Sequence, residues 1–126
     1  MALILADSDV LIDSLRGREP AASRVAQYLR AGVLATTAVT LFELQSGART
    51  KREREKVEAL LRALIILPFD ENAALEAARV RRDLEGQGRP IGMADYLIAG
   101  TCLAQKAVLM TRNREHFARV DGLVLE

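Results

Sequence analysis

Two acidic residues, one position apart, follow the first apolar segment of the chain and could take part in chemistry. The segment runs from Leu3 to Ala6 and is followed at once by Asp7 and Asp9. A short apolar run is typical of a buried parallel strand, and ligands of α/β sheets bind beyond the carboxyl ends of such strands. The pattern therefore predicts that both acids lie at a crevice. Helix capping is the structural alternative for Asp7 or for Ser8.

Further oxygen-bearing side chains are predicted to lie at the ends of later elements. Glu43 lies near a predicted helix start, and Asp95 lies in the first turn of the most apolar predicted helix. Thr111 and Asn113 follow a predicted strand. Structural alternatives apply here too, because Thr40 and Glu43 match a capping box and an acid in a first turn is stabilised by the helix dipole.

Several carboxylates at one edge of a sheet would raise one another's pKa values, and a divalent cation would relieve that repulsion. Mg²⁺ prefers oxygen ligands and is usually held by one or two carboxylates, with water completing the shell. Ser8, Thr37 and Thr111 could supply neutral oxygens nearby. A cation held in this way polarises a phosphoryl oxygen and lowers the pKa of a bound water. The residue types therefore indicate metal-assisted attack of water on a phosphoryl group.

Strand-like and helix-like segments alternate along the chain. Continuous apolar runs predict strands at residues 3–6, 33–36, 63–67, 108–111 and 123–125. Periodicity and helix-terminal residues predict helices at residues 10–15, 20–31, 40–47, 49–62, 70–85 and 94–106, and a polar turn at residues 112–116. This alternation predicts one α/β domain over residues 1–126, in which a mainly parallel sheet of four to five strands is flanked by helices on both faces.

The composition limits the class of protein. Of the 126 residues, 50% are hydrophobic and 28% are charged, as in an ordinary globular domain. The net charge of +1 means that any contact with nucleic acid must come from a local patch. The single cysteine, Cys102, lies in an apolar run and is expected to be buried. There is neither the basic region of a signal peptide nor an apolar stretch of about 20 residues, so we expect a cytoplasmic protein without a membrane span.

Basic residues near the predicted site are candidates for contacts with phosphate. Arg112 and Arg114 follow the fourth predicted strand and fit this role best. The basic residues between positions 49 and 56 are interleaved with glutamates, which predicts a solvated helix face. His116 is the only histidine and falls in the polar turn, so we expect a structural role. The chain contains no nucleophile elbow, P-loop, dinucleotide-binding glycine pattern or zinc-type Cys/His spacing.

Four segments in order resemble the PIN-domain ribonucleases, above all the VapC toxins of bacterial VapBC toxin–antitoxin systems. They lie within residues 5–13, 40–48, 91–99 and 109–117. The resemblance covers essentially the whole chain and implies that Asp7, Glu43 and Asp95 are metal ligands. Asn113 stands where many members have a fourth acid, which leaves one charge fewer. Asp9 stands where the family often has a neutral polar residue.

The resemblance also implies a three-layer PIN-like fold. The reaction that it implies is hydrolysis of RNA with Mg²⁺ or Mn²⁺, which leaves a 5′-phosphate and a 3′-hydroxyl. The catalytic residues would be Asp7, Glu43, Asp95 and Asn113, and the expected accessory residues are Ser8, Asp9 and Thr111. The implied partners are a second copy of the chain, as a homodimer, and a small VapB-type antitoxin that covers the site.

Two other functions agree with parts of the pattern. Residues 7–11 also resemble the opening motif of haloacid-dehalogenase-type phosphatases, in which Asp7 would be the nucleophile and Asp9 the acid/base. That alternative explains Asp9 better than the nuclease does, and it explains Glu43 and Asp95 less well. The second alternative, kept open by Asn113, is a PIN-like domain that lacks catalysis and acts only as a binding partner.

Overall fold

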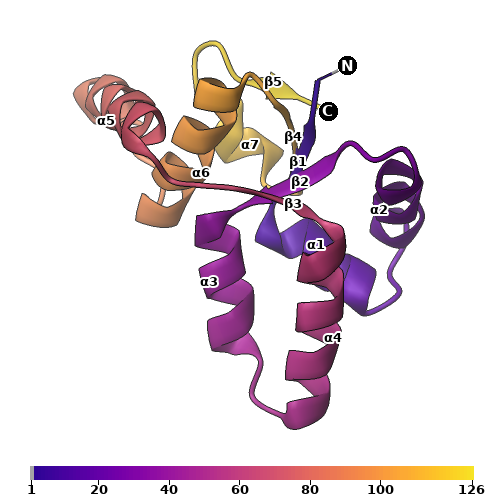
Figure 1. Cartoon of the computed structure of the whole chain (residues 1–126). Helices are drawn as coiled ribbons and strands as arrows, with labels where there is room; N and C mark the ends of the chain where they lie inside the picture. The colour runs from indigo at the N-terminus through magenta and orange to yellow at the C-terminus, as the bar shows by residue number, and fades with distance from the viewer. Residues whose placement is uncertain (1) are drawn as a thin grey trace.

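A parallel five-stranded sheet forms the middle layer of the protein (Figure 1). The computed structural model describes residues 2–126. The strands are β1 (Ile4–Ala6), β2 (Leu34–Thr37), β3 (Ile65–Leu67), β4 (Val108–Met110) and β5 (Val124–Leu125), in the order β3-β2-β1-β4-β5. Every neighbouring pair is parallel, which confirms the predicted sheet. The central strand is β1, so the residues after it have the ends of β2 and β4 on either side.

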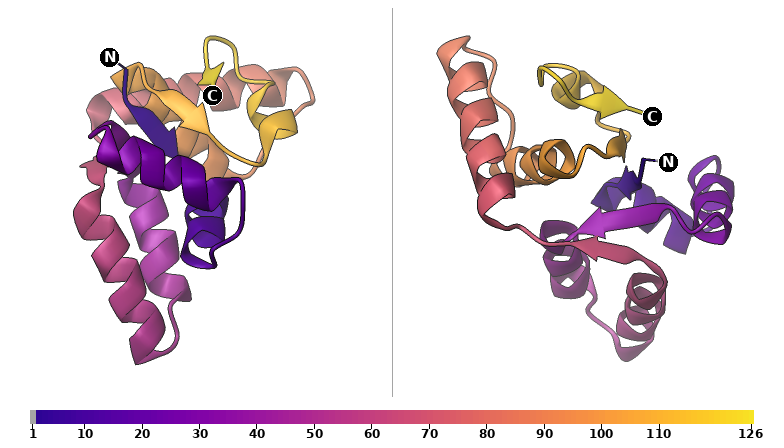
Figure 2. Two further views of the ribbon diagram at one scale, coloured as in Figure 1. Left: turned by 90° about the vertical axis from the view of Figure 1, so that its right-hand side faces the viewer. Right: turned by 45° about the horizontal axis from the view of Figure 1, so that its top comes forward.

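Helices cover both faces of the sheet (Figure 2), which confirms the three-layer arrangement. Between residues 2 and 126 they are α1 (Ser8–Leu15), α2 (Ala21–Arg30), α3 (Ala38–Gly47), α4 (Lys51–Ala63), α5 (Glu71–Gly86), α6 (Met93–Gln105) and α7 (Arg114–Phe117). Leu5 packs into a core with α5 and α6, whereas Ala6 packs into a core with α1, α2 and α4. Successive residues of β1 thus bury opposite faces, as strand geometry requires.

The start of α3 differs from the sequence prediction. Thr37, at the end of β2, is the N-cap, and its side-chain oxygen accepts a hydrogen bond from the backbone N–H of Thr40 at 2.9 Å. The predicted capping box of Thr40 and Glu43 is therefore wrong, because Thr40 is already inside the helix with a fully buried side chain. A capping box is formed instead by Thr50 and Glu53 at the start of α4. Glu43 is consequently free of a capping role.

The polar turn predicted near the C-terminus is a short helix in the structure. Residues 114–117 form the single-turn helix α7 where a polar turn was expected, and the fully buried Phe117 anchors it to the core.

Cys102 is buried, as predicted. Its thiol donates a hydrogen bond to the Ala107 carbonyl at 3.2 Å, and burial raises its pKa to about 12. No helix within residues 2–126 is long and apolar enough to cross a membrane.

The helices α5 and α6 are packed unusually closely where they cross. A Cβ atom added to Gly100 of α6 would lie 2.5 Å from the Ala73 carbonyl oxygen and 2.6 Å from the Ala77 Cβ of α5. Both alanines are buried. This contact fixes α6 against α5, and it thereby sets the position of the first turn of α6, which carries Asp95.

Candidate active site

Asp7 lies at the carboxyl end of the central strand and is buried, with 5% of its surface exposed. Its backbone N–H donates to the Met110 carbonyl at 3.0 Å, which continues the pairing of β1 with β4. One carboxylate oxygen accepts from the backbone N–H of Ser8 at 2.8 Å, and the other accepts from the Thr111 hydroxyl at 2.8 Å. Asp7 therefore caps α1, which confirms the structural alternative, and it is also fixed by the end of β4.

The environment of Asp7 makes its ionised form costly. Its pKa is raised from 3.8 to about 6, mainly by burial and then by the negative charge of Asp9, with a smaller contribution from Asp95. The hydrogen bonds from Thr111 and Ser8 lower the pKa, but they do not compensate for these effects. A carboxylate held in this state is stabilised by any cation that binds to it.

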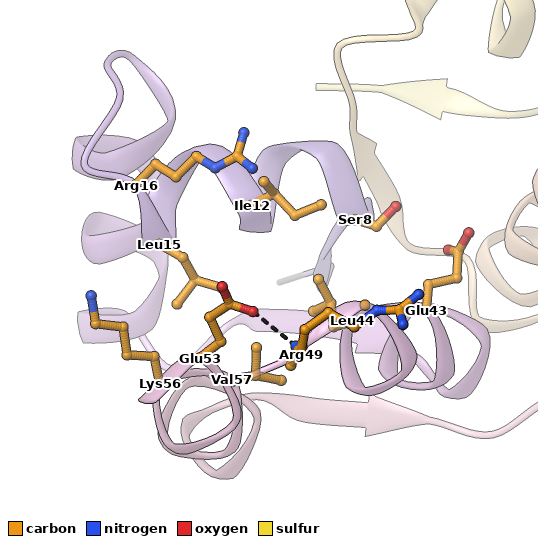
Figure 3. A pocket seen from close by; sticks show the side chains of 12 residues that line it. Ser8, Ile12, Leu15, Arg16, Glu43, Leu44, Arg49, Glu53, Lys56 and Val57 are labelled. Atoms are coloured by element: carbon orange, nitrogen blue, oxygen red, sulfur yellow. Dashed lines mark hydrogen bonds between the residues drawn. The ribbon is translucent and has the colours of Figure 1, made fainter. Parts of the chain in front are cut away.

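Glu43 of α3 contributes the second carboxylate and is half-buried. Burial raises its pKa, the charges of Asp95 and Asp9 raise it further, and the Ser8 hydroxyl lowers it. Its Oε1 atom is buried and has no hydrogen-bond partner among residues 2–126. An unpartnered buried carboxylate oxygen is expensive unless a ligand satisfies it. Figure 3 shows Ser8 and Glu43 together at one end of a cavity beside α1 and α3.

Asp95 supplies the third carboxylate from the first turn of α6. Burial raises its pKa most, His116 lowers it, and Asp9 raises it. The Asn113 side-chain nitrogen donates to Asp95 Oδ2 at 3.4 Å and lies 2.9 Å from His116 Nδ1. The backbone N–H of Asn113 donates to the Thr111 hydroxyl at 3.0 Å, so one hydrogen-bonded chain joins Asp95 to Asp7.

His116 lies closer to these acids than the sequence indicated. Its Nδ1 atom is 3.9 Å from Asp95 Oδ2. A polar turn gave no reason to place it here, but residues three apart on a helix share a face, and α7 brings His116 back beside its N-cap residue Asn113. The spacing of three residues between Asn113 and His116 is the sequence signal that could have placed His116 near the acids.

Asp9 is electrostatically coupled to all three carboxylates, since its charge raises the pKa values of Asp7, Glu43 and Asp95. It also accepts a long hydrogen bond, 3.5 Å, from the backbone N–H of Arg112. Asp9 thus adds negative charge to the group and ties α1 to the segment after β4.

The two arginines expected to contact phosphate differ in their position relative to the acidic group. The Arg112 side chain lies 3.3 Å from an oxygen of Asp13 and 3.9 Å from one of Asp9. Arg114 donates to the backbone carbonyl of Glu126 at 2.7 Å, which directs it toward the last residue of the chain. The structure therefore gathers the predicted acids and polar residues at one edge, and it leaves Arg114 outside that group.

The donor set suits a hard divalent cation. The carboxylates of Asp7, Glu43 and Asp95 offer oxygen atoms, and Glu43 Oε1 is buried and unpaired. No three His, Cys, Asp or Glu residues within the described range 2–126 form a ready-made ligand cluster. Within residues 2–126 the three carboxylates are thus not drawn together around one point, and a cation bound among them would take several of its ligands from water, as Mg²⁺ commonly does.

The comparisons with known proteins agree with this fold and arrangement. The family model described as PIN domain matches residues 4–123. The chain is 38% identical to "Ribonuclease VapC10" of Mycobacterium tuberculosis over 96% of this chain and 90% of that protein. It is 31% identical to "tRNA(fMet)-specific endonuclease VapC" of Shigella flexneri over 100% of this chain and 98% of that protein.

A solved structure of a VapBC complex contains a chain with the same fold. The structure of VapBC2 from Rickettsia felis, bound to a DNA fragment from their promoter, contains a chain that superimposes with a TM-score of 0.90 at 25% identity. The superposition covers 98% of this chain and 97% of that one. The family match and the identity to the VapC relatives both extend over nearly the whole sequence. The chain therefore belongs to the PIN domain family and, within it, to the VapC group.

Proposed function

We propose that this chain is a ribonuclease toxin that hydrolyses phosphodiester bonds of RNA and is neutralised by a VapB-type antitoxin. The observation that carries the proposal is the convergence of Asp7, Glu43 and Asp95 at the carboxyl edge of the sheet, each with a raised pKa. The names of the VapC relatives and the solved VapBC complex support the activity and the partner.

The proposal includes Mg²⁺ or Mn²⁺ as the cofactor, held by Asp7, Glu43 and Asp95. A bound cation of this kind polarises the phosphoryl group and lowers the pKa of a bound water. Asp7 can act as a ligand although both its oxygens accept hydrogen bonds, because an ionised carboxylate offers about four lone-pair sites. Glu43 would help to hold the cation, and its buried Oε1 is a carboxylate oxygen left without a hydrogen-bond partner among residues 2–126.

Residues of the chain orient the substrate and the acids. Thr111 holds Asp7, and Asn113 holds Asp95, so neither carboxylate has to be ordered when RNA binds. Attack of water on phosphorus breaks the bond to the 3′ oxygen, which takes up a proton and leaves as a 3′-hydroxyl, while the phosphate stays on the 5′ oxygen of the following nucleotide. Asn113 is proposed as a catalytic residue that positions water or phosphate through its amide.

The phosphatase alternative gives Glu43 and Asp95 no role, although the charge of Asp95 acts on both Asp7 and Glu43. The match of the PIN domain model to residues 4–123 also favours the nuclease.

The proposal also includes a homodimer and a cytoplasmic location, where an RNA-cleaving enzyme meets its substrate. Light scattering of the purified chain tests the dimer.

Incubation of antitoxin-free protein with total cellular RNA tests the proposed reaction. We expect discrete products with 5′-phosphate ends in Mg²⁺ or Mn²⁺, no products when a chelator is present, and inhibition by the antitoxin. Cleavage that persists in chelator would contradict the metal dependence. No cleavage by the folded protein under any metal condition would favour the alternative of a domain that only binds.

A further inference from the structure

A cavity of about 610 Å³ lies directly beside the acidic group, between α1, α3 and α4 (Figure 3). Ser8 and Glu43 line one end of it, and the side chain of Lys56 lies at the other end. Its size is within the range of roughly 300–1,000 Å³ that is usual for pockets that bind organic ligands. The cavity is thus continuous with the place where the scissile phosphate would bind.

Three basic side chains line this cavity: Arg16 at the end of α1, Arg49 in the α3–α4 connection, and Lys56 of α4. All three are exposed. None of the ion pairs formed among residues 2–126 includes any of them. Unpaired cations around a cavity favour an anionic ligand.

Glu53, one of the two acidic residues that line the cavity, is already engaged. The Glu53 carboxylate accepts hydrogen bonds from the backbone N–H groups of Arg49 at 2.8 Å and Thr50 at 3.4 Å, which caps α4. The lining thus holds three cations and two acids, Glu43 and Glu53. Arg49 extends toward Glu43, whereas Arg16 and Lys56 lie away from Glu43, where two cations accompany one acid and the wall stays net positive (Figure 3).

The rest of the lining is aliphatic. Ile12 and Leu15 of α1 face Leu44 and Val57 across the cavity, and no aromatic side chain within residues 2–126 lines it. Aliphatic side chains and arginine planes can pack against a base or a ribose without selecting one base. The combination of unpaired cations with an apolar lining suits a flexible polyanion with flat, weakly polar groups.

We propose that this cavity binds the single-stranded RNA segment on one side of the scissile phosphodiester, and that Arg16, Arg49 and Lys56 contact its backbone phosphates. The inference rests on the proposed ribonuclease function. It is favoured over an acidic peptide because the cavity begins at Ser8 and Glu43, so a strand that crosses the acids enters it directly. It also revises the interpretation of residues 49–56 as only a solvated helix face.

The test variant is Arg16→Gln with Lys56→Gln, placed in an Asp95→Asn background so that RNA is not cleaved. Binding of a fluorescently labelled single-stranded RNA of mixed sequence is followed by anisotropy in chelator over a series of salt concentrations. We expect affinity to fall about tenfold or more and the slope of log K against log salt to shrink by about 1.4, for two phosphate contacts. The matched control is Arg30→Gln with Arg62→Gln, which removes two other exposed, unpaired arginines outside the cavity and should leave both values almost unchanged.

Three results would overturn the inference. They are an RNA affinity of the test variant equal to that of the control, no RNA binding by the Asp95→Asn background itself, and loss of antitoxin binding with RNA affinity retained. The last would assign the cavity to a protein partner. Because this assay needs neither metal nor cleavage, its failure is distinguishable from failure of the proposed function, which the cleavage of RNA by the parent chain tests separately.

Discussion

Asp7 has a structural task and a proposed chemical one. It caps α1 through the N–H of Ser8 and is held by the Thr111 hydroxyl, but burial and the charge of Asp9 still raise its pKa to about 6. The capping bond explains why an acid here is compatible with folding. The raised pKa shows that the folded protein tolerates the charge at a cost, which a bound cation would remove.

The substitution Asp7→Asn tests that cost. Because the folded-state pKa lies above the ordinary value of 3.8, the favourable contribution of Asp7 is complete below about pH 4 and is lost as the pH rises through about 6. Ionisation above that pH costs about 3 kcal/mol, and the amide loses about 1 kcal/mol at Thr111, so the variant should be more stable than the parent by about 1–2 kcal/mol near pH 8 without metal. Near pH 4 the gain should be absent.

Urea unfolding in chelator at both pH values measures this difference. Addition of Mg²⁺ should stabilise the parent more than the variant. A variant that is less stable than the parent at pH 8 as well as at pH 4 would show that the hydrogen bonds of Asp7, and not its charge, dominate its effect on folding.

The helices place the acids with a precision that depends on a few contacts. Thr37 starts α3 at Ala38, which turns Glu43 toward Ser8 instead of toward the helix start. Gly100 allows α6 to approach α5 closely and so sets the position of Asp95. The geometry of the site is therefore determined partly by residues that have no polar role in it.

Replacement of Gly100 by alanine tests this packing. Its Cβ would lie 2.5 Å from a backbone oxygen of α5, so we expect a loss of about 1–3 kcal/mol, although alanine is intrinsically better in a helix by up to about 1 kcal/mol. The control is Gly86→Ala in α5, where an added Cβ meets nothing within 4 Å and stability should be unchanged or slightly higher. Thermal melting of both proteins gives the comparison, and a Gly100→Ala protein as stable as the control would contradict the close-packing argument.

The elements differ in how well the sequence specified them. The strands were predictable because each is a short apolar run, and α5 and α6 because their periodicity is long. The start of α3 was not, because both Thr37 and Thr40 can cap a helix and only the end of β2 decides between them. The helix α7 has four residues, too few for a periodic pattern, so the only sequence signal for the position of His116 was its spacing of three residues from Asn113.

In the molecule as a whole, parallel topology collects residues that are far apart in sequence. The central position of β1 brings Asp7 next to Thr111 after β4, while α3 and α6 add Glu43 and Asp95. The acids could be grouped from the sequence because they follow predicted strands or begin predicted helices, and because the motif resemblance assigns them to one site. The cavity could not, since Arg16 and Lys56 belong to separate helices and a net charge of +1 conceals the local separation of acidic and basic residues.

The proposed function requires that the gathered carboxylates cleave RNA. Its test compares the parent with Asp95→Asn and with Asp121→Asn, which removes the same charge at an exposed position outside the acidic group. With Mg²⁺ or Mn²⁺ and total RNA, we expect the parent and Asp121→Asn to give the same products, and Asp95→Asn to lose activity by about 100-fold or more while its melting temperature shows it to be folded. An Asp95→Asn protein that cleaves RNA as fast as the parent would contradict the account.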